Sequence, residues 1–283
     1  MIDKNAEIAI IGLGLIGGSY AEALSQAGYP VIGIDIDEKA VEYALERNWI
    51  VSGSSDPDTI GSCSLVISAL YPDAFVQWVR KNRNAFKKDA ILTDVTGVKR
   101  AVISQVNEAL RDDVEFIATH PMAGRESRGI GYADSSQFAG ANFIIVPTPR
   151  NTDRAVETAR QLAEILGFQR ISVLTPEQHD RIIGFVSQLC HVIAVSLMNI
   201  TDDPRLVEYT GDSFRDLTRI AQINEDLWPQ LFIANKDNLM SEIDNLISQM
   251  EIMKKLIEEE DVEAMKKLMK QAGERRSRFE KPQ

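Results

Sequence analysis

The stretch EIAIIGLGLIGGSY, residues 7–20, decides the fold of the first half of this chain. It joins a short apolar run to a glycine-rich turn, and a second apolar run follows and ends at Asp35. Gly12 permits a tight turn, Gly14 lets the backbone approach a pyrophosphate, and Gly17 allows the next helix to pack close to the strand. The order of strand, glycine turn, helix, strand and acidic residue predicts a dinucleotide site.

The acidic residue also predicts which dinucleotide binds. Asp35 would accept a hydrogen bond from the adenosine ribose 2′-hydroxyl and repel a 2′-phosphate, which favours NAD over NADP. Asp37 is expected to cap the following helix. The predicted cofactor-binding residues are Gly12, Gly14, Leu15, Ile16, Gly17 and Asp35.

Length and composition limit the possible classes of protein. At 283 residues two domains are expected. The formal charge of −11 argues against binding nucleic acid through its phosphates. We expect no membrane span, since no apolar stretch approaches the roughly 20 residues required, and no signal peptide. The only two cysteines, Cys63 and Cys190, predict neither a disulfide nor a metal site, and a cytoplasmic location fits.

Strand and helix signals alternate as far as about residue 173. Apolar runs near residues 64–70, 90–94, 114–119, 142–146 and 170–173 are separated by helical patterns. The alternation predicts a Rossmann-type, doubly wound and mainly parallel sheet, with residues 1–173 forming an NAD-binding domain.

No convincing strand signal follows, and residues 174–283 are predicted to form an all-helical domain. Thr175, Pro176 and Gln178 indicate a capped helix start. A long helix is expected from residue 231 to 257, with one apolar side. A helix of that length buries its apolar side against something, either the rest of the chain or, as we expect, a second copy in a homodimer.

Three histidines are the candidates for moving protons: His120, His179 and His191. His120 directly follows a predicted strand, and Pro121 is expected to stop the strand pairing there. Ligands bind at the carboxyl ends of strands in open parallel sheets. The ordinary pKa of an imidazole suits proton exchange near neutrality, so His120 is the predicted base.

Several distant motifs resemble those of the prephenate and arogenate dehydrogenase family. The first two are residues 12–19 and the run Thr-His-Pro-Met-Ala-Gly-Arg-Glu-Ser at 119–127. The others are the His-Asp pair at 179–180 and residues 187–191, then residues 214–221 and Trp228. They occur in the family's order over most of the chain.

The resemblance implies an activity and a set of site residues. Such enzymes oxidise prephenate with NAD, with loss of carbon dioxide, to give 4-hydroxyphenylpyruvate for tyrosine synthesis. His120 matches the catalytic histidine, and Arg219 the arginine that holds a substrate carboxylate. The remaining matches are positions in or near the family's substrate pocket: Ser187, His191, Asp216 and Trp228. The resemblance also implies a second domain that is helical and dimeric. Of the other arginines, we place Arg215, Arg125 and Arg128 near substrate less firmly.

Two departures from the family pattern matter. The family often has a Gly-Ser pair where this chain has Thr96-Gly97, so the hydroxyl falls one residue earlier. We expect Thr96 to substitute for that serine in positioning His120 and the nicotinamide. His179 is expected to be structural, and Cys190 a small buried apolar residue.

Alternatives remain open. Arogenate, the amino analogue, could be the preferred substrate. A 3-hydroxyacid dehydrogenase would, by resemblance to that family, carry a lysine or a His–Glu pair in the first helix of the second domain. The helix from Pro176 to Ile200 contains no lysine, which argues against the lysine version. A non-catalytic NAD-binding protein would have no reason to keep His120 and Arg219 together.

Overall fold

The computed structural model describes residues 2–124 and 127–279. The chain divides into two compact units, Met1–Lys236 and Asp237–Gln283. The first unit holds the sheet and also the first helices after residue 173. The predicted domain boundary at 173/174 rests on sequence character rather than compactness and stays a prediction.

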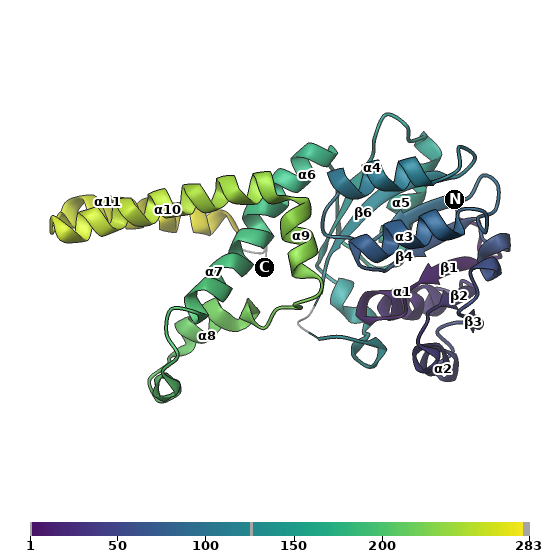
Figure 1. The fold of residues 1–283 in the computed structure, drawn as a ribbon, viewed down its shortest axis with the longest axis horizontal. Helices are drawn as coiled ribbons and strands as arrows, with labels where there is room; N and C mark the ends of the chain where they lie inside the picture. The colour runs from purple at the N-terminus through teal and green to yellow at the C-terminus, as the bar shows by residue number, and fades with distance from the viewer. Residues whose placement is uncertain (1, 125–126, 280–283) are drawn as a thin grey trace. The chain divides into compact units, whose positions relative to one another are not determined.

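An eight-stranded, mainly parallel sheet forms the centre of the first unit (Figure 1), as predicted. Its order is β3-β2-β1-β4-β5-β6-β7-β8, and only the pairing of β6 with β7 is antiparallel among these neighbours. The short strand β3 was not predicted. The strands are β1 (Ile8–Ile11), β2 (Val31–Ile34), β3 (Ser52–Ser54), β4 (Leu65–Ser68), β5 (Ile91–Asp94), β6 (Glu115–Met122), β7 (Asn142–Val146) and β8 (Arg170–Val173).

Helices cover both faces of the sheet, because successive residues of a buried strand point to opposite sides. Ile8 and Ile10 of β1 pack in one apolar core with α1, α2 and α5. Ala9 and Ile11 pack in the other with α3 and α4, which lie side by side (Figure 1). These helices are α1 (Leu15–Gln26), α2 (Glu38–Glu46), α3 (Pro72–Asn82), α4 (Arg100–Ala109) and α5 (Asp153–Ile165). Short 3-10 turns occur at Pro57–Ser62, Ile130–Tyr132, Ser135–Phe138 and Pro204–Glu208.

Strand β6 continues through Pro121 to Met122, so the prediction that proline stops the pairing there was wrong. The pairing with β5 ends at Ile117, and from there on β7 alone pairs with β6. Pro121 therefore occupies an edge position, where the missing N–H is tolerated. His120 lies inside the strand, opposite Ile144, rather than on a loop after it.

The chain after residue 174 is helical, as predicted. Thr175 and Gln178 form the expected capping box. Helix α6 (Pro176–Ile183) runs through a π-helical turn, η4 (Gly184–Gln188), into α7 (Leu189–Met198). Then come α8 (Asp212–Thr218), the 3-10 turn η6 (Arg219–Ala221) and α9 (Trp228–Ala234).

The predicted continuous helix from 231 to 257 was wrong, because α9 ends at Ala234. The next residue, Asn235, leaves helical backbone values (φ −121°, ψ 24°). Its side-chain amide donates to the carbonyl oxygen of Asp180 and to Oε1 of Gln188. These buried hydrogen bonds stabilise the interruption between the two helices at Asn235. The second unit consists of α10 (Lys236–Glu258), α11 (Val262–Arg276) and a last turn, Ser277–Phe279.

One helical segment of the described residues, Pro176–Met198, is long and apolar enough to cross a membrane by length and composition. The expectation that no stretch would qualify was therefore wrong. One such helix is weak evidence for a membrane span, because core helices of soluble proteins pass the same test; 28% of the apolar window of this helix is buried.

Candidate active site

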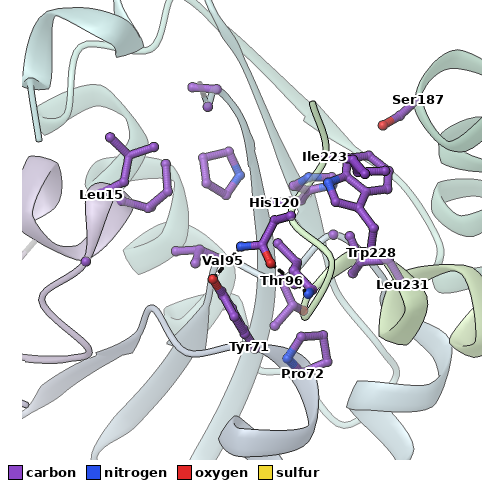
Figure 2. Close-up of a pocket in the computed structure, with 18 of the residues that line it drawn as sticks. Leu15, Tyr71, Pro72, Val95, Thr96, His120, Ser187, Ile223, Trp228 and Leu231 are labelled. Atoms are coloured by element: carbon purple, nitrogen blue, oxygen red, sulfur yellow. Dashed lines mark hydrogen bonds between the residues drawn. The ribbon is translucent and has the colours of Figure 1, made fainter. Parts of the chain in front are cut away.

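A pocket of about 580 Å³ lies at the carboxyl ends of the strands. Residues 14–16, 69–72 and 95–97, which follow β1, β4 and β5, form one side, here called the nucleotide wall. Pocket residues from segments 183–191 and 220–231 form the helical wall. Figure 2 shows Leu15 on one side, Ser187 and Trp228 on the other, and His120 between them.

The glycine turn has the geometry that a pyrophosphate requires. Gly12 has φ +90°, which side chains other than glycine rarely adopt. A Cβ on Gly17 would lie 1.8 Å from the carbonyl oxygen of Gly12, whereas a Cβ on Gly14 would meet nothing within 4 Å. Helix α1 has no side-chain cap at Gly14, so its first N–H groups are available to an anion. These observations fit a bound dinucleotide.

Asp35 ties the turn to the end of β2. Its Oδ2 accepts the backbone N–H of Leu13 at 2.6 Å, and its Oδ1 accepts that of Asp37 at 2.9 Å. Asp37 caps α2 through the N–H of Lys39, as predicted. Leu15 and Ile16 line the pocket, as Gly14 does.

A buried charged cluster fixes the ends of β5 and β6 beneath the pocket. The Lys99 ammonium donates to Asp94 Oδ2 at 2.7 Å, to the Thr119 carbonyl at 2.6 Å and to Thr96 Oγ1 at 3.2 Å. All three donors of the ammonium are thereby used, which offsets its desolvation. Burial lowers the pKa of Lys99, and Asp94 opposes that shift.

Thr96 belongs to this cluster. Its hydroxyl bonds to the Asp94 carboxylate and lies 3.0 Å from the carbonyl oxygen of Val98. Among the described residues its recorded bonds involve Asp94, Val98 and Lys99, and none involves His120. A Cβ on Gly97 would be 3.9 Å from Cε1 of His120. The position next to the imidazole is therefore glycine, with no hydroxyl.

His120 lies in the pocket between the two walls (Figure 2). Its Nδ1 lies 2.9 Å from Nε2 of His179. Burial, His179 and the Lys99 ammonium lower the pKa of His120 well below its ordinary value. The imidazole is therefore neutral near pH 7 and can accept a proton.

His179 is fully buried behind His120. Its Nδ1 is 2.8 Å from Oδ1 of Asp180. The same carboxylate accepts the backbone N–H groups of Lys99 and Arg100, at the start of α4, at 2.8 and 2.9 Å. Burial lowers the pKa of His179, and the bond to Asp180 opposes the shift.

Ser187, His191 and Trp228 all line the helical wall. The His191 and Trp228 rings lie against each other, with centroids 3.6 Å apart. His191 Nδ1 lies 3.0 Å from the carbonyl oxygen of Ser187. The π-helical turn carries Ser187 and buried Gln188, whose amide donates to the Leu231 carbonyl. Such turns often occur at functional sites.

Of the four arginines predicted to lie near the substrate, the described pocket lining includes one. Arg219 is exposed beside the helical wall, where its neighbour Ile220 lines the pocket, and neither Arg219 nor Asp216 is among the described lining residues. Arg215 donates to Asp212 and to the Thr210 carbonyl. Arg128 lines the pocket, and Arg125 lies outside the described residues.

Arg128, which the sequence analysis placed near the substrate, donates to Glu225 at 2.6 Å and to Asp226 at 3.2 Å, and so joins the loop after β6 to the helical wall. Its two acceptors and the next pair of residues were not predicted from sequence. Asn224 donates to the Tyr71 hydroxyl at 2.6 Å, a bond drawn in Figure 2. No periodicity marks these loop residues. Among the described residues, no group of His, Cys, Asp and Glu is placed to hold a metal ion, and both cysteines are free, with Cys190 exposed rather than buried as expected.

A dinucleotide turn facing a neutral histidine across one pocket defines a nicotinamide-dependent dehydrogenase. Two family models match the chain: the nucleotide-binding domain of prephenate dehydrogenase over residues 20–180, and its dimerization domain over residues 175–271. The chain belongs to the prephenate dehydrogenase family, and it is an NAD-dependent oxidoreductase.

Individual relatives agree. Prephenate dehydrogenase of Bacillus subtilis (strain 168) is 27% identical over 279 residues, which are 95% of this chain and 75% of the relative. The crystal structure of prephenate dehydrogenase from Aquifex aeolicus, in complex with hydroxyphenyl propionate and NAD+, matches with a TM-score of 0.90 at 26% identity, over 99% of this chain and 100% of that one. Synechocystis arogenate dehydrogenase, at 23% identity, shares the fold with a TM-score of 0.84 over 97% and 100% of the two chains.

Proposed function

We propose that this protein oxidises prephenate with NAD, with decarboxylation, to give 4-hydroxyphenylpyruvate. The observation that carries the proposal is the position of His120 between the glycine turn and the helical wall of one pocket, where burial lowers the pKa of its imidazole. The resemblance of the motifs and the family membership support the substrate class.

In this reaction His120 accepts the proton of the ring hydroxyl while the C–H bond at the same carbon breaks. The cofactor, when bound, supplies the acceptor for the hydride. Loss of carbon dioxide then leaves its electron pair in the ring, which becomes aromatic, and the oxygen takes the proton back from His120. The histidine therefore holds the proton only transiently, and the net reaction releases none to solvent. The protein contributes mainly orientation and a dry base.

On the substrate side, Arg219 would hold a carboxylate, since a guanidinium matches its two oxygens. Ser187, His191 and Trp228 would line the substrate ring and side chain. Thr96 would act on His120 only indirectly, through the cluster with Asp94.

We further propose that the helical part, residues 174–283, forms a homodimer interface and that the protein works in the cytoplasm. The match to a dimerization domain supports the first point. Exposed apolar side chains on this part, among them Phe185, Val186 and Leu217, agree with a partner surface. Asp216 would complete the substrate site within the assembled dimer.

Arogenate is the second candidate substrate. The carboxylates of Glu225 and Asp226, held beside the pocket by Arg128, could meet an amino group there. A relative from Zymomonas mobilis is named cyclohexadienyl dehydrogenase, and it is 28% identical over 265 residues.

The test is formation of NADH by the purified protein with prephenate, with arogenate and with a 3-hydroxyacid. Turnover of prephenate with release of carbon dioxide is expected. Turnover of arogenate without turnover of prephenate would show that the substrate is arogenate. Binding of NAD without turnover of any of the three would leave a non-catalytic NAD-binding protein.

A further inference from the structure

Three side chains form a hydrogen-bonded row that runs from the pocket into the protein. Nδ1 of His120 lies 2.9 Å from Nε2 of His179, and Nδ1 of His179 lies 2.8 Å from Oδ1 of Asp180. His120 comes from β6 of the sheet, whereas the other two come from α6. His179 and Asp180 are buried, and neither lines the pocket. The row therefore reaches the reacting atoms only through His120.

The bonds of Asp180 determine where each proton sits. Its carboxylate accepts N–H groups from Lys99 and Arg100, and the start of α4 favours its ionised form. An ionised carboxylate only accepts, so Nδ1 of His179 carries the hydrogen. A neutral His179 then has a lone pair on Nε2, which must receive the Nδ1–H of His120. The lone pair of His120 is left on Nε2.

We propose that His179, held by Asp180, is a positioning residue that fixes His120 in the tautomer with Nε2 as its proton acceptor. It also stabilises the imidazolium formed when the substrate O–H bond breaks and the Nε2–H bond forms. No proton crosses the row, because both Nδ1–H bonds persist. This inference rests on the proposed function for its kinetic consequence only.

The neighbours of His120 explain why such a support is needed. The hydroxyl of Thr96 bonds to Asp94, and Gly97 carries no side chain. Within the described residues, the recorded hydrogen bond of the His120 ring is the one to His179. An imidazole without it could rotate or exchange tautomers, and the wrong tautomer presents N–H to the substrate instead of a lone pair.

The first test uses nitrogen NMR of histidine labelled in the ring, with the whole chain and no substrate. The protein has three histidines, so the signals can be assigned by substitution. We expect His120 and His179 each to be neutral and protonated on Nδ1. In His179→Ala the single tautomer of His120 should give way to a mixture. Finding His120 protonated on Nε2 in the unsubstituted protein would overturn the inference.

The second test separates kcat from KM. His179→Ala should lower kcat about 100-fold, within the usual range for proton-transfer assistance, and leave both KM values within about threefold, since His179 touches no ligand. His179→Gln should retain much more activity, because its amide oxygen can accept the Nδ1–H. Arg181→Gln, an exposed change on the same helix, is the matched control.

The outcomes can be told apart. An unchanged kcat in His179→Ala, or equal losses in the Ala and Gln variants with both folded, would refute the positioning role. Absence of turnover by the unsubstituted protein would refute the proposed function instead, and the NMR experiment would still decide the state of His120.

Discussion

The nucleotide wall and the helical wall of the pocket are built in different ways. The nucleotide wall is mostly backbone: a glycine turn, an uncapped helix start and a carboxylate that bonds to the turn. The helical wall consists of side chains on short helices. Helix α8, which lies outside this wall, has no buried residue among those described, and Arg219 at its end is exposed.

This difference indicates which parts of the chain determine the specificity for the cofactor and which determine the specificity for the substrate. Contacts inside one chain complete the cofactor side, so its geometry is fixed before any ligand arrives. The substrate side has exposed apolar and charged groups next to it, which we attribute to the proposed dimer. The two walls should therefore respond separately to substitution.

The largest effect is expected for His120→Asn, which removes the base between the walls. We expect kcat to fall at least about 1,000-fold, because asparagine cannot accept the hydroxyl proton. The dissociation constant for NAD, measured by fluorescence titration, should change less than about threefold, since the glycine turn is untouched. Retained turnover would show that another group is the base.

A large effect on one wall alone is expected for Arg219→Ala. Loss of a charge-assisted bond to a substrate carboxylate should raise the KM for prephenate about 100-fold, equivalent to about 2.7 kcal/mol. The KM for NAD should stay constant. Arg215→Ala is the matched control, because that guanidinium bonds to Asp212 and Thr210 instead. An unchanged KM for prephenate would remove Arg219 from the site.

The same contrast explains what could be predicted from sequence. The glycine turn and Asp35 lie within 24 residues, and each has a local physical reason, so their arrangement was predictable. The sheet followed from apolar runs, except β3, which is three residues of Ser and Gly. Two of the wrong predictions arose because local rules do not take tertiary contacts into account. Strand β7 alone pairs with β6 beside Pro121, and Asn235 has buried hydrogen-bond partners.

The row behind His120 was the least predictable feature. His179 was assigned a structural role, because a histidine inside a helix is usually that. Its contact with His120 spans 59 residues, and the bond from Asp180 to Lys99 spans 81. No spacing rule reaches across such separations, so the contact needed the fold.

A moderate effect on the other wall is expected for Asp35→Asn. The amide oxygen can still accept the N–H of Leu13, but the charge that repels a 2′-phosphate is gone. We expect the ratio of kcat/KM for NAD over NADP to fall about tenfold, or about 1.4 kcal/mol. Asp37→Asn should leave the ratio unchanged, since asparagine also caps a helix. A constant ratio in Asp35→Asn would place cofactor selection elsewhere.

The smallest expected effect is on the free energy of unfolding, and it arises from His120, between the two walls, and from His179 behind it. His120 and His179 both have a lowered pKa when folded, although Asp94 and Asp180 nearby oppose the influence of burial and Lys99 on His179. Below about pH 6.5 the unfolded chain therefore binds more protons at these two groups than the folded chain does.

The free energy of unfolding should consequently fall as the pH drops from about 6.5 toward 5, with a slope of up to about 1.4 kcal/mol per pH unit for each histidine. It should be independent of these groups above about pH 7.5, where both states are neutral. Urea unfolding at a series of pH values measures this slope, and His120→Asn should reduce it by about half. A slope that is identical in the variant would mean that folding does not lower the pKa of His120, and burial would then not be what keeps this imidazole neutral.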